Sequence, residues 1–479
     1  MNFSEDIVAG FAVLSSAIAL YFATGLHPHW WLTWIAPVPV LVLAARVSRR
    51  TAFVVAFLAW ALGGLNLWNY FRRLLETPLT VTLLIICLPA LAFAAGVLLY
   101  RWMLQKSLWR AALVLPSFWV SMEFLNALTS PHSTAGNLGY TQMDFLPILQ
   151  IASVTGIWSI SFCLFLFTAA LAIMIGRTGS TGERRNLALG VTVVLVAVLG
   201  FGAWRLVSAP AGVHTVRVGL VASDERQNLL TEQPADTFRL LREYAVQAEA
   251  LATQGASVVV IPEKIAVLAD GELPDADELL RSAAAKTNAL IVVGVIHPTN
   301  GAKWNEARLY FPDGSIQTYS KHHMLPAFEG KLTVGTTRTE WTDAAGKFGV
   351  QICKDMDFPQ LSREYGNDGT ALLVVPAWDF VADGWWHGRM AILRGVESGF
   401  SIVRSPKQGI LTVTDNRGRV LGERTTGGAA FDNLVSTVPV QHEATLYNRF
   451  GDWFGWANLA LLVLLIVTGW MRTKQVRTS

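Results

Sequence analysis

The sequence predicts an α-helical membrane bundle of eight transmembrane helices joined to an α/β domain. The chain has 479 residues, of which 52% are hydrophobic and only 15% are charged, whereas a soluble globular protein carries roughly 25% charged residues. Apolar stretches long enough to span a bilayer fill the first part of the chain. Runs of β-branched residues alternating with helical patterns fill most of the remainder. This composition excludes a wholly soluble enzyme, a disordered chain and a disulfide-stapled secreted domain.

The membrane part is predicted from eight apolar stretches. A helix needs about 20 apolar residues to cross the hydrocarbon core of a bilayer. The second stretch is short and contains Pro37 and Pro39, so we expect a broken or tilted helix there. The first stretch lacks a basic flank and a cleavage site, which favours a membrane helix over a signal peptide. The expected spans are 7–24, 30–46, 51–70, 78–100, 108–126, 150–176, 187–207 and 455–471.

The positions of lysine and arginine predict the orientation, because short cytoplasmic loops carry an excess of these residues. With the N-terminus in the cytoplasm, twelve basic residues fall in the inner loops and the tail. The outer short loops then hold only Arg72 and Arg73, and the segment 208–449 emerges on the extracytoplasmic side. The twelve are Arg46, Arg49, Arg50, Arg101, Lys106, Arg110, Arg177, Arg184, Arg185, Arg472, Lys474 and Arg477.

The chain is therefore divided into a transmembrane domain (1–207), a polar α/β domain (208–449) and a final helix with a cytoplasmic tail (450–479). The polar domain alternates short β-branched runs with helical patterns, which is typical of a sheet covered on both faces. We expect strands at 215–221, 257–261, 289–295, 349–353 and 371–375, helices at 235–253 and 275–287, and two hairpins, 306–311 with 316–321 and 409–414 with 420–423.

Three residues of the polar domain are candidates for chemistry. Cys353 is expected at the end of a strand, where a thiol is well placed as a nucleophile, although a free cysteine is also commonly a buried packing residue. Glu263 follows the strand 257–261 and is either a general base or a solvated loop carboxylate. Lys321 closes a hairpin, where a lone lysine is usually a surface charge. None of the three indicates a reaction by itself.

Other kinds of site find no support in the sequence. Cys87 and Cys163 lie in apolar runs, so Cys353 has no disulfide partner within the polar domain. No CxxC or HExxH spacing occurs, so we expect no bound metal, and nothing calls for an organic cofactor. The formal net charge of +3 is too small to favour a nucleic-acid partner.

Together, Glu263, Lys321 and Cys353 resemble the Glu–Lys–Cys triad of the nitrilase superfamily. The flanking sequences are similar too: Pro262-Glu, Tyr319-Ser-Lys-His-His-Met-Leu-Pro and Ile352-Cys-Lys-Asp-Met-Asp-Phe-Pro. The resemblance implies an αββα sandwich in which the carboxylate accepts the thiol proton and the lysine stabilises an oxyanion. Combined with the membrane spans, it extends to the apolipoprotein N-acyltransferase family, which the stretches 30–39, 136–142, 150–156 and 446–452 also resemble.

The resemblance implies a ping-pong acyl transfer. Cys353 would take an acyl chain from a phospholipid donor as a thioester and pass it to the N-terminal amine of a diacylglyceryl-cysteine in an apolipoprotein. Glu329 matches a second family glutamate that orients the lysine, and Asp355 stands where the family usually has Glu and would support the site. The implied location is the bacterial inner membrane, with the catalytic domain on the periplasmic face and no cofactor.

Three departures from the family pattern leave other acceptors open. Lys354 follows the nucleophile where the family usually has Tyr, and the segments 375–380 and 405–409 also differ from it. The alternatives are an acyltransferase with a different acceptor, a membrane-tethered amidase or nitrilase in which water resolves the acyl-enzyme, and a non-enzymatic scaffold. The presence of Glu263, Lys321 and Cys353 argues against the hypothesis of a non-enzymatic scaffold. The eight predicted spans argue against the hypothesis of a hydrolase, since a soluble amide substrate would not require them.

Overall fold

The computed structural model describes residues 3–208, 213–224 and 234–478. The chain divides into two compact units. The first, here the helical unit, comprises residues 1–129, 136–207 and 452–479. The second, here the α/β unit, comprises residues 130–135 and 208–451. The side chains of the basic tail beyond Met471, on which part of the predicted orientation rests, lie outside the described residues.

Seven helices among the described residues are long and apolar enough to cross a membrane. The α5 helix begins where its stretch was predicted to begin, and α9 begins a few residues before its predicted start. Most other helix ends lie equally close to the predicted ends. A π-helical turn, η3 (Tyr70–Leu74), follows the second of the seven. The seven are α1 (Phe3–Ala23), α3 (Arg49–Gly63) with η2 (Gly64–Leu67), α4 (Leu79–Leu104), α5 (Leu108–Thr129), α8 (Trp158–Gly176), α9 (Thr181–Val207) and α16 (Trp453–Thr478).

Two predicted spans differ from the structure. The stretch 30–46 forms two short helices, η1 (Leu32–Trp34) and α2 (Val38–Ala44), because Pro37 and Pro39 cannot donate the backbone hydrogen bonds that would join them. The stretch 150–176 becomes a long helix only from Trp158, because Gly156 takes a left-handed φ of 68° and ends the preceding turn. Short helices stand before it: η4 (Leu138–Gln142), α6 (Leu146–Leu149) and α7 (Ala152–Thr155).

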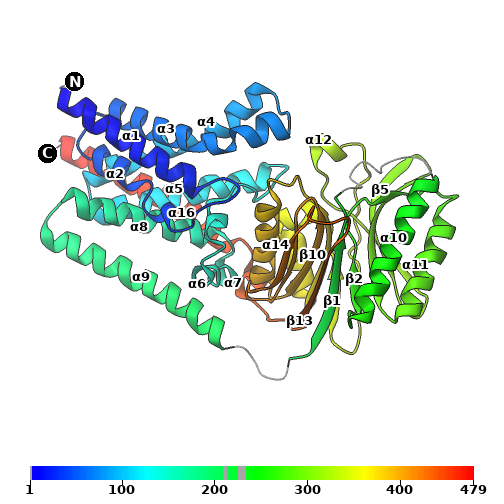
Figure 1. The fold of residues 1–479 in the computed structure, drawn as a ribbon. Helices are drawn as coiled ribbons and strands as arrows, with labels where there is room; N and C mark the ends of the chain where they lie inside the picture. The colour runs from blue at the N-terminus through cyan, green and yellow to red at the C-terminus, as the bar shows by residue number, and fades with distance from the viewer. Residues whose placement is uncertain (1–2, 209–212, 225–233, 479) are drawn as a thin grey trace. The chain divides into compact units, whose positions relative to one another are not determined.

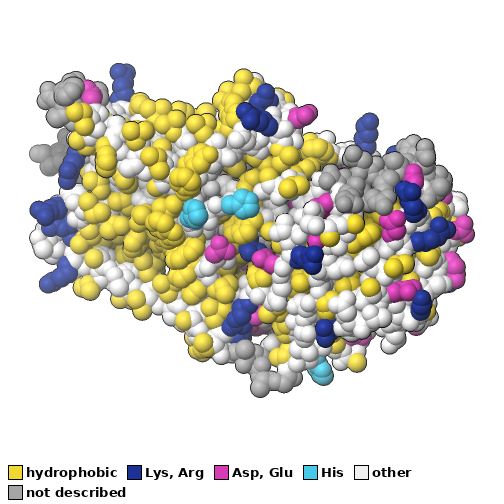
Figure 2. All heavy atoms as spheres, in the orientation of Figure 1, with side chains coloured by type: hydrophobic (Ala, Val, Ile, Leu, Met, Phe, Trp, Pro, Cys, Tyr) yellow, Lys and Arg dark blue, Asp and Glu magenta, His cyan; other side chains and the backbone are white. Residues whose placement is uncertain are grey.

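The outer surface of the helical unit is apolar. Hydrophobic side chains cover much of its visible face (Figure 2). Phe11, Leu14 and Ile18 of α1 and Val193 and Val196 of α9 are all exposed. A soluble protein rarely leaves so many large apolar side chains in contact with water. The surface of this unit is therefore suited to contact lipid, and the chain is a membrane protein.

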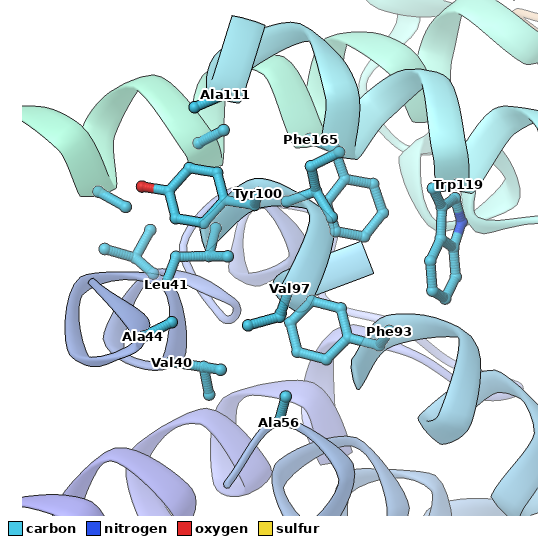
Figure 3. Packing of buried hydrophobic residues seen from close by; sticks show 14 of the residues in the cluster. Val40, Leu41, Ala44, Ala56, Phe93, Val97, Tyr100, Ala111, Trp119 and Phe165 are labelled. Atoms are coloured by element: carbon cyan, nitrogen blue, oxygen red, sulfur yellow. The ribbon is translucent and has the colours of Figure 1, made fainter. Parts of the chain in front are cut away.

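The interior of the helical unit is packed around aromatic rings from four helices, α3, α4, α5 and α8. The ring of Trp60 lies 4.6 Å from that of Trp119 and 4.8 Å from that of Phe93, and Trp119 lies 5.0 Å from Phe165. Alanines are interleaved with these rings (Figure 3). Small residues let the helix backbones approach closely, which is how helices associate in lipid.

The α/β unit contains two sheets. The first has the order β13-β1-β2-β4-β5-β6, with β3 paired to β4, and the second has the order β12-β11-β10-β9-β8-β7. The strands are β1 (Thr215–Ala222), β2 (Val258–Val260), β3 (Ala266–Val267), β4 (Leu290–Thr299), β5 (Ala302–Tyr310), β6 (Ile316–Ser320), β7 (Glu340–Thr342), β8 (Lys347–Val350), β9 (Leu372–Trp378), β10 (Ser401–Lys407), β11 (Ile410–Thr414), β12 (Val420–Thr425) and β13 (Asp432–Pro439).

The two sheets pack face to face with helices on their outer faces, which confirms the predicted αββα sandwich. Alternation along the strands explains the layers. Val218 and Leu220 of β1 meet Val374 and Val403 of the other sheet in the central core, whereas Val221 faces the helices. Figure 1 shows α10 and α11 over the first sheet and α14 over the second. The helices are α10 (Pro234–Thr253), α11 (Leu273–Thr287), α12 (Pro326–Glu329), α13 (Pro359–Asn367), α14 (Gly384–Ser398) and α15 (Leu446–Phe450).

The predicted strands and hairpins are present with small shifts in their bounds, but the predicted end of one strand is wrong. The strand expected at 349–353 ends at Val350, and Cys353 instead begins the 3₁₀ turn η5 (Cys353–Asp357). Both hairpins form, and Glu306 pairs with Ser320 in the first of them. The thiol is therefore carried on a turn beyond the strand.

Candidate functional site

The candidate site lies where several strands of the α/β unit end. Glu263 follows β2, Lys321 follows β6, and Cys353 stands beyond β8. The backbone N–H of Glu263 donates to the carbonyl of Ala377 (3.3 Å), and the thiol of Cys353 donates to the carbonyl of the next residue, Trp378 (3.4 Å). The backbone of Glu263 and the thiol of Cys353 are thus hydrogen-bonded to consecutive residues at the end of β9.

Glu263 is buried, with 1% of its surface exposed. Its Oε1 atom accepts hydrogen bonds from the ammonium of Lys321 (2.7 Å) and the side-chain amide of Asn305 (2.6 Å). Its Oε2 atom has no hydrogen-bond partner among the described residues. One carboxylate oxygen is thus fixed in place, and the other remains available to accept a proton.

A glycine makes room for the backbone that carries Glu263. Gly294 of β4 passes so close to the segment after β2 that a Cβ atom there would lie 2.5 Å from the Cα of Glu263 and 2.6 Å from the carbonyl oxygen of Pro262. Real Cβ atoms essentially never approach so closely. The absent side chain lets the backbone carrying Glu263 lie directly on β4.

Lys321 is held between two carboxylates. Its ammonium donates to Glu263 and to both oxygens of Glu329 (3.1 and 2.9 Å). Burial lowers the pKa of Lys321, but the carboxylates of Glu263 and Glu329 outweigh burial and hold that pKa well above its usual value. Lys321 is therefore a permanent cation, which is what the stabilisation of a developing oxyanion requires.

Glu329 ends α12 and is likewise buried. Burial raises the pKa of Glu329, but the ammonium groups of Lys321 and Lys264 outweigh it and hold that pKa far below its usual value. The backbone N–H of Leu325 also donates to Glu329 Oε2 (2.8 Å). Glu329 is therefore a fixed anion that holds Lys321 in place.

Cys353 adopts a strained backbone conformation. Its φ of 45° lies in the left-handed region, which residues other than glycine seldom occupy. Burial, and next the charge of Glu263, raise the pKa of the Cys353 thiol well above its usual value, against the opposing effects of Lys321 and Arg404. The thiol is protonated at rest and needs a base to become a nucleophile.

Asp355 joins the loop that carries Lys321 to the turn that carries Cys353. The carboxylate is fully buried. Its Oδ2 atom accepts from the hydroxyl of Tyr319 (2.7 Å) and the N–H of Ile352 (3.1 Å). Its Oδ1 atom accepts from the N–H groups of His322 (3.2 Å) and His323 (2.8 Å). Asp355 binds both loops and contacts neither the thiol nor the ammonium through these bonds.

The three departures from the family pattern occupy the same region. Lys354 is buried and paired with Asp357 (2.9 Å), and its ammonium lies 3.2 Å from His132 Nδ1. The segment 375–380 supplies Trp378, and the segment 405–409 supplies Lys407, whose ammonium lies 3.6 Å from the centre of the Trp378 ring. The three stretches that the sequence analysis singled out as departures therefore lie close to Cys353.

Several polar residues of the site were missed in the sequence. Asn305, inside β5, donates to both Glu263 (2.6 Å) and Glu329 (3.0 Å). Asp379 and Arg404 form a buried pair with two hydrogen bonds (2.5 and 2.8 Å). No local motif marks these positions, because sheet register alone brings them to the site. Lys264 could have been found, since it directly follows Glu263.

Two family models match the chain. Residues 16–171 match the apolipoprotein N-acyltransferase N-terminal domain, and residues 221–427 match the carbon-nitrogen hydrolase family. Similar proteins include the apolipoprotein N-acyltransferases of Geobacter metallireducens (27% identical, covering 94% of this chain and 92% of that protein) and Haemophilus ducreyi (23% identical, covering 95% of each).

Among solved structures, an amidase from a Nesterenkonia species is 20% identical, with a TM-score of 0.42, and covers 52% of this chain and 98% of its own. The two family models fall on the two units of the chain, and the relatives match both units over nearly their full lengths. The chain therefore belongs to the apolipoprotein N-acyltransferase family, in which a membrane-embedded bundle is joined to a nitrilase-superfamily domain.

Proposed function

We propose that this protein transfers an acyl chain from a phospholipid, through a thioester on Cys353, to the N-terminal amine of a diacylglyceryl-cysteine in an apolipoprotein. The relatives that match nearly its whole length are apolipoprotein N-acyltransferases. The observation that carries the mechanism is the state of the Glu263 carboxylate. One of its oxygens is bound by Lys321 and Asn305, while the other is unpaired among the described residues and can act as a base.

In the first half-reaction, Cys353 Sγ attacks the carbonyl carbon of the donor ester, and its proton passes to Glu263. The carbon–oxygen π electrons move onto the carbonyl oxygen, where the ammonium of Lys321 stabilises the negative charge. When the carbonyl re-forms, the bond to the glycerol oxygen breaks. That oxygen takes the proton from Glu263, and a lysophospholipid leaves.

In the second half-reaction, the neutral amine of the acceptor attacks the thioester carbon. Glu263 takes a proton from the attacking nitrogen, and Lys321 again stabilises the oxyanion. Collapse breaks the carbon–sulfur bond, forms an amide, and returns the proton to the Cys353 thiolate. A high thiol pKa suits this cycle, because the thiolate exists only transiently and is re-protonated after each turnover.

Glu329 and Asp355 support this chemistry without taking part in it. Glu329 orients the ammonium of Lys321 through two hydrogen bonds. Asp355 holds the loop of Lys321 against the turn of Cys353. We place the protein in the bacterial inner membrane with the α/β unit on the periplasmic side, since the basic residues of the short loops favour that orientation.

The intermediate can be measured directly. The full-length enzyme in lipid nanodiscs is incubated with a phospholipid that carries an isotope-labelled acyl chain, and the peptide containing Cys353 is analysed by mass spectrometry. We expect a labelled thioester on the wild-type protein and none on Cys353→Ala. Cys163→Ser is the matched control, because Cys163 is a buried thiol of α8 and should leave the thioester yield unchanged.

A second stage tests the acceptor. Adding a diacylated lipopeptide should discharge the thioester and form an N-acylated product of the expected mass. Discharge at the same rate in water alone would identify a hydrolase instead. A thioester that persists with the diacylated lipopeptide but is discharged by another amine would show that the acceptor differs.

A further inference from the structure

A second lysine, Lys264, lies among the charged groups of the site. Its ammonium lies 2.6 Å from Glu329 Oε1 and 3.6 Å from Glu263 Oε1. Its side chain is only 13% exposed. The distance to Glu329 is shorter than either distance from Lys321 to that carboxylate. Lys264 is therefore a principal partner of Glu329.

The backbone of Lys264 is held in an unfavourable conformation. Its φ is 51°, in the left-handed region. Such a conformation persists only where the surroundings impose it, and it is common at functional sites. The ammonium of Lys407 donates to the Lys264 carbonyl (3.0 Å) and lies 3.6 Å from the centre of the Trp378 ring. The ammonium of Lys264 lies 5.0 Å from the centre of the same ring.

These contacts connect Lys264 to the nucleophile. Trp378 accepts the hydrogen bond of the Cys353 thiol through its carbonyl oxygen while its ring lies beside both lysines. The indole N–H of Trp378 donates to Gln408 (2.7 Å), which fixes the ring. The segments that depart from the family pattern, 375–380 and 405–409, thus supply the residues that hold Lys264 in place.

The charges of the cluster sum to zero only when Lys264 is included. Glu263 and Glu329 are negative, and Lys321 and Lys264 are positive. During acyl transfer, Glu263 becomes neutral as the oxyanion becomes negative, so the sum stays at zero. Without Lys264, the buried cluster would carry a net negative charge in both states. Proteins relieve such a charge by binding a proton.

We propose that Lys264 is a positioning residue of the acyl transfer, which neutralises the carboxylate pair so that Glu263 remains an ionised base and Lys321 remains available to the oxyanion. This inference rests on the proposed function. Lys264 touches neither substrate nor thiol in this scheme. It acts through Glu329 and Glu263.

The other charged groups around the thiol do not replace Lys264. Arg404 and Asp379 neutralise each other through their two hydrogen bonds. Lys321 is already shared by both carboxylates. Burial, and next the charge of Lys264, lower the pKa of Lys407 to about 7, so its amine is only partly protonated at neutral pH and carries little charge at alkaline pH. Lys264 is thus the cation that balances the second carboxylate.

The test compares Lys264→Met, Lys264→Arg and the control Lys286→Met, which removes an exposed lysine of α11. Alkylation of Cys353 by iodoacetamide, in which Glu263 must accept the thiol proton, is followed by mass spectrometry from about pH 4 to pH 9 in the full-length protein. A shift of about one pH unit is within reach of a single neighbouring charge. We expect the midpoint for Lys264→Met to move to higher pH by about that amount, with Lys264→Arg and Lys286→Met close to wild type.

The same variants are then assayed for thioester formation from the labelled phospholipid. We expect Lys264→Met to acylate roughly tenfold more slowly at pH 7, to recover at higher pH, and to keep the KM for the donor. A slower variant whose pH profile overlays that of wild type would overturn the proposal, since a purely structural defect slows every pH equally. A double variant, Lys264→Met with Lys407→Met, prevents Lys407 from replacing the lost positive charge. An alkylation midpoint that does not shift in this double variant would also overturn the proposal.

The two measurements separate this inference from the proposed function. If the alkylation midpoint shifts as expected but no phospholipid thioester forms on the wild-type protein, the acyl donor is wrong while the role of Lys264 stands. If the wild-type thioester forms and neither pH profile responds to Lys264→Met, the proposed function stands and the role of Lys264 is rejected.

Discussion

The hydroxyl of Tyr319 donates to Asp355 Oδ2 at 2.7 Å, across 36 residues of chain. Tyr319 is two residues before Lys321, and Asp355 is two residues after Cys353. Both side chains are buried. Since Asp355 also accepts from the backbone N–H groups of both loops, it sets the spacing between the proposed cation and the proposed nucleophile.

Replacing Asp355 by Asn should impair the site strongly. An amide can accept at one end only, so buried backbone donors lose their partner, which costs about 3 kcal/mol of folding stability. We expect a lower thermal midpoint and at least a tenfold loss in the rate of thioester formation. Tyr319→Phe removes one donor and should have a milder effect. Equal rates for Asp355→Asn and wild type would show that the loop spacing does not depend on this carboxylate.

Replacing Asn305 by Ala should slow acylation without weakening donor binding. The amide holds both carboxylates, and its loss lets Glu263 move away from its position beside Lys321. We expect roughly a tenfold lower rate of thioester formation, on the scale of a lost positioning hydrogen bond, with an unchanged KM for the phospholipid. A rise in KM with an unchanged maximal rate would place Asn305 in substrate binding instead.

Replacing Gly335 by Ala should displace Lys321. A Cβ atom at position 335 would lie 2.1 Å from the carbonyl oxygen of Ser320, and the N–H of Gly335 donates to the carbonyl of Lys321 (2.8 Å). Forcing the two segments apart should cost about 1–3 kcal/mol of stability. Denaturation midpoints check this. Gly271→Ala is the control, because nothing lies within 4 Å of a Cβ atom there.

His387 should make the stability of the α/β unit depend on pH. Burial lowers the pKa of His387, but the carboxylate of Asp383, 3.2 Å away, outweighs it and raises that pKa to about 9. Since this value exceeds that of the unfolded chain, the stabilisation is fully present below about pH 6.5 and is lost as pH rises through about 9. It amounts to at most about 3 kcal/mol.

The measurement compares denaturation midpoints of wild type and His387→Gln at about pH 6 and pH 9.5. The difference between the two proteins should be large at the lower pH and small at the higher pH. A difference that does not change with pH would mean that His387 contributes through packing alone.

Local patterns in the chain were enough to predict an α/β domain and most of the membrane helices, because a span needs a minimum of apolar residues and a buried strand needs a β-branched run. The αββα sandwich and the selection of Glu263, Lys321 and Cys353 followed from the resemblance to the nitrilase superfamily. Pro37 and Pro39 likewise predicted that the second helix is broken, since proline lacks the backbone N–H that a helix requires.

Other features depended on contacts between distant segments. Asn305 and Lys264 meet Glu329 because the order and register of β2, β4, β5 and β6 bring their chain positions to one place. The left-handed turn at Cys353 is imposed by the loops packed around it, against the intrinsic preference of the residue. The charge balance within the site also depends on contacts between distant segments. A carboxylate and an ammonium neutralise each other when they are close in space, and neighbouring residues in the sequence do not specify that distance.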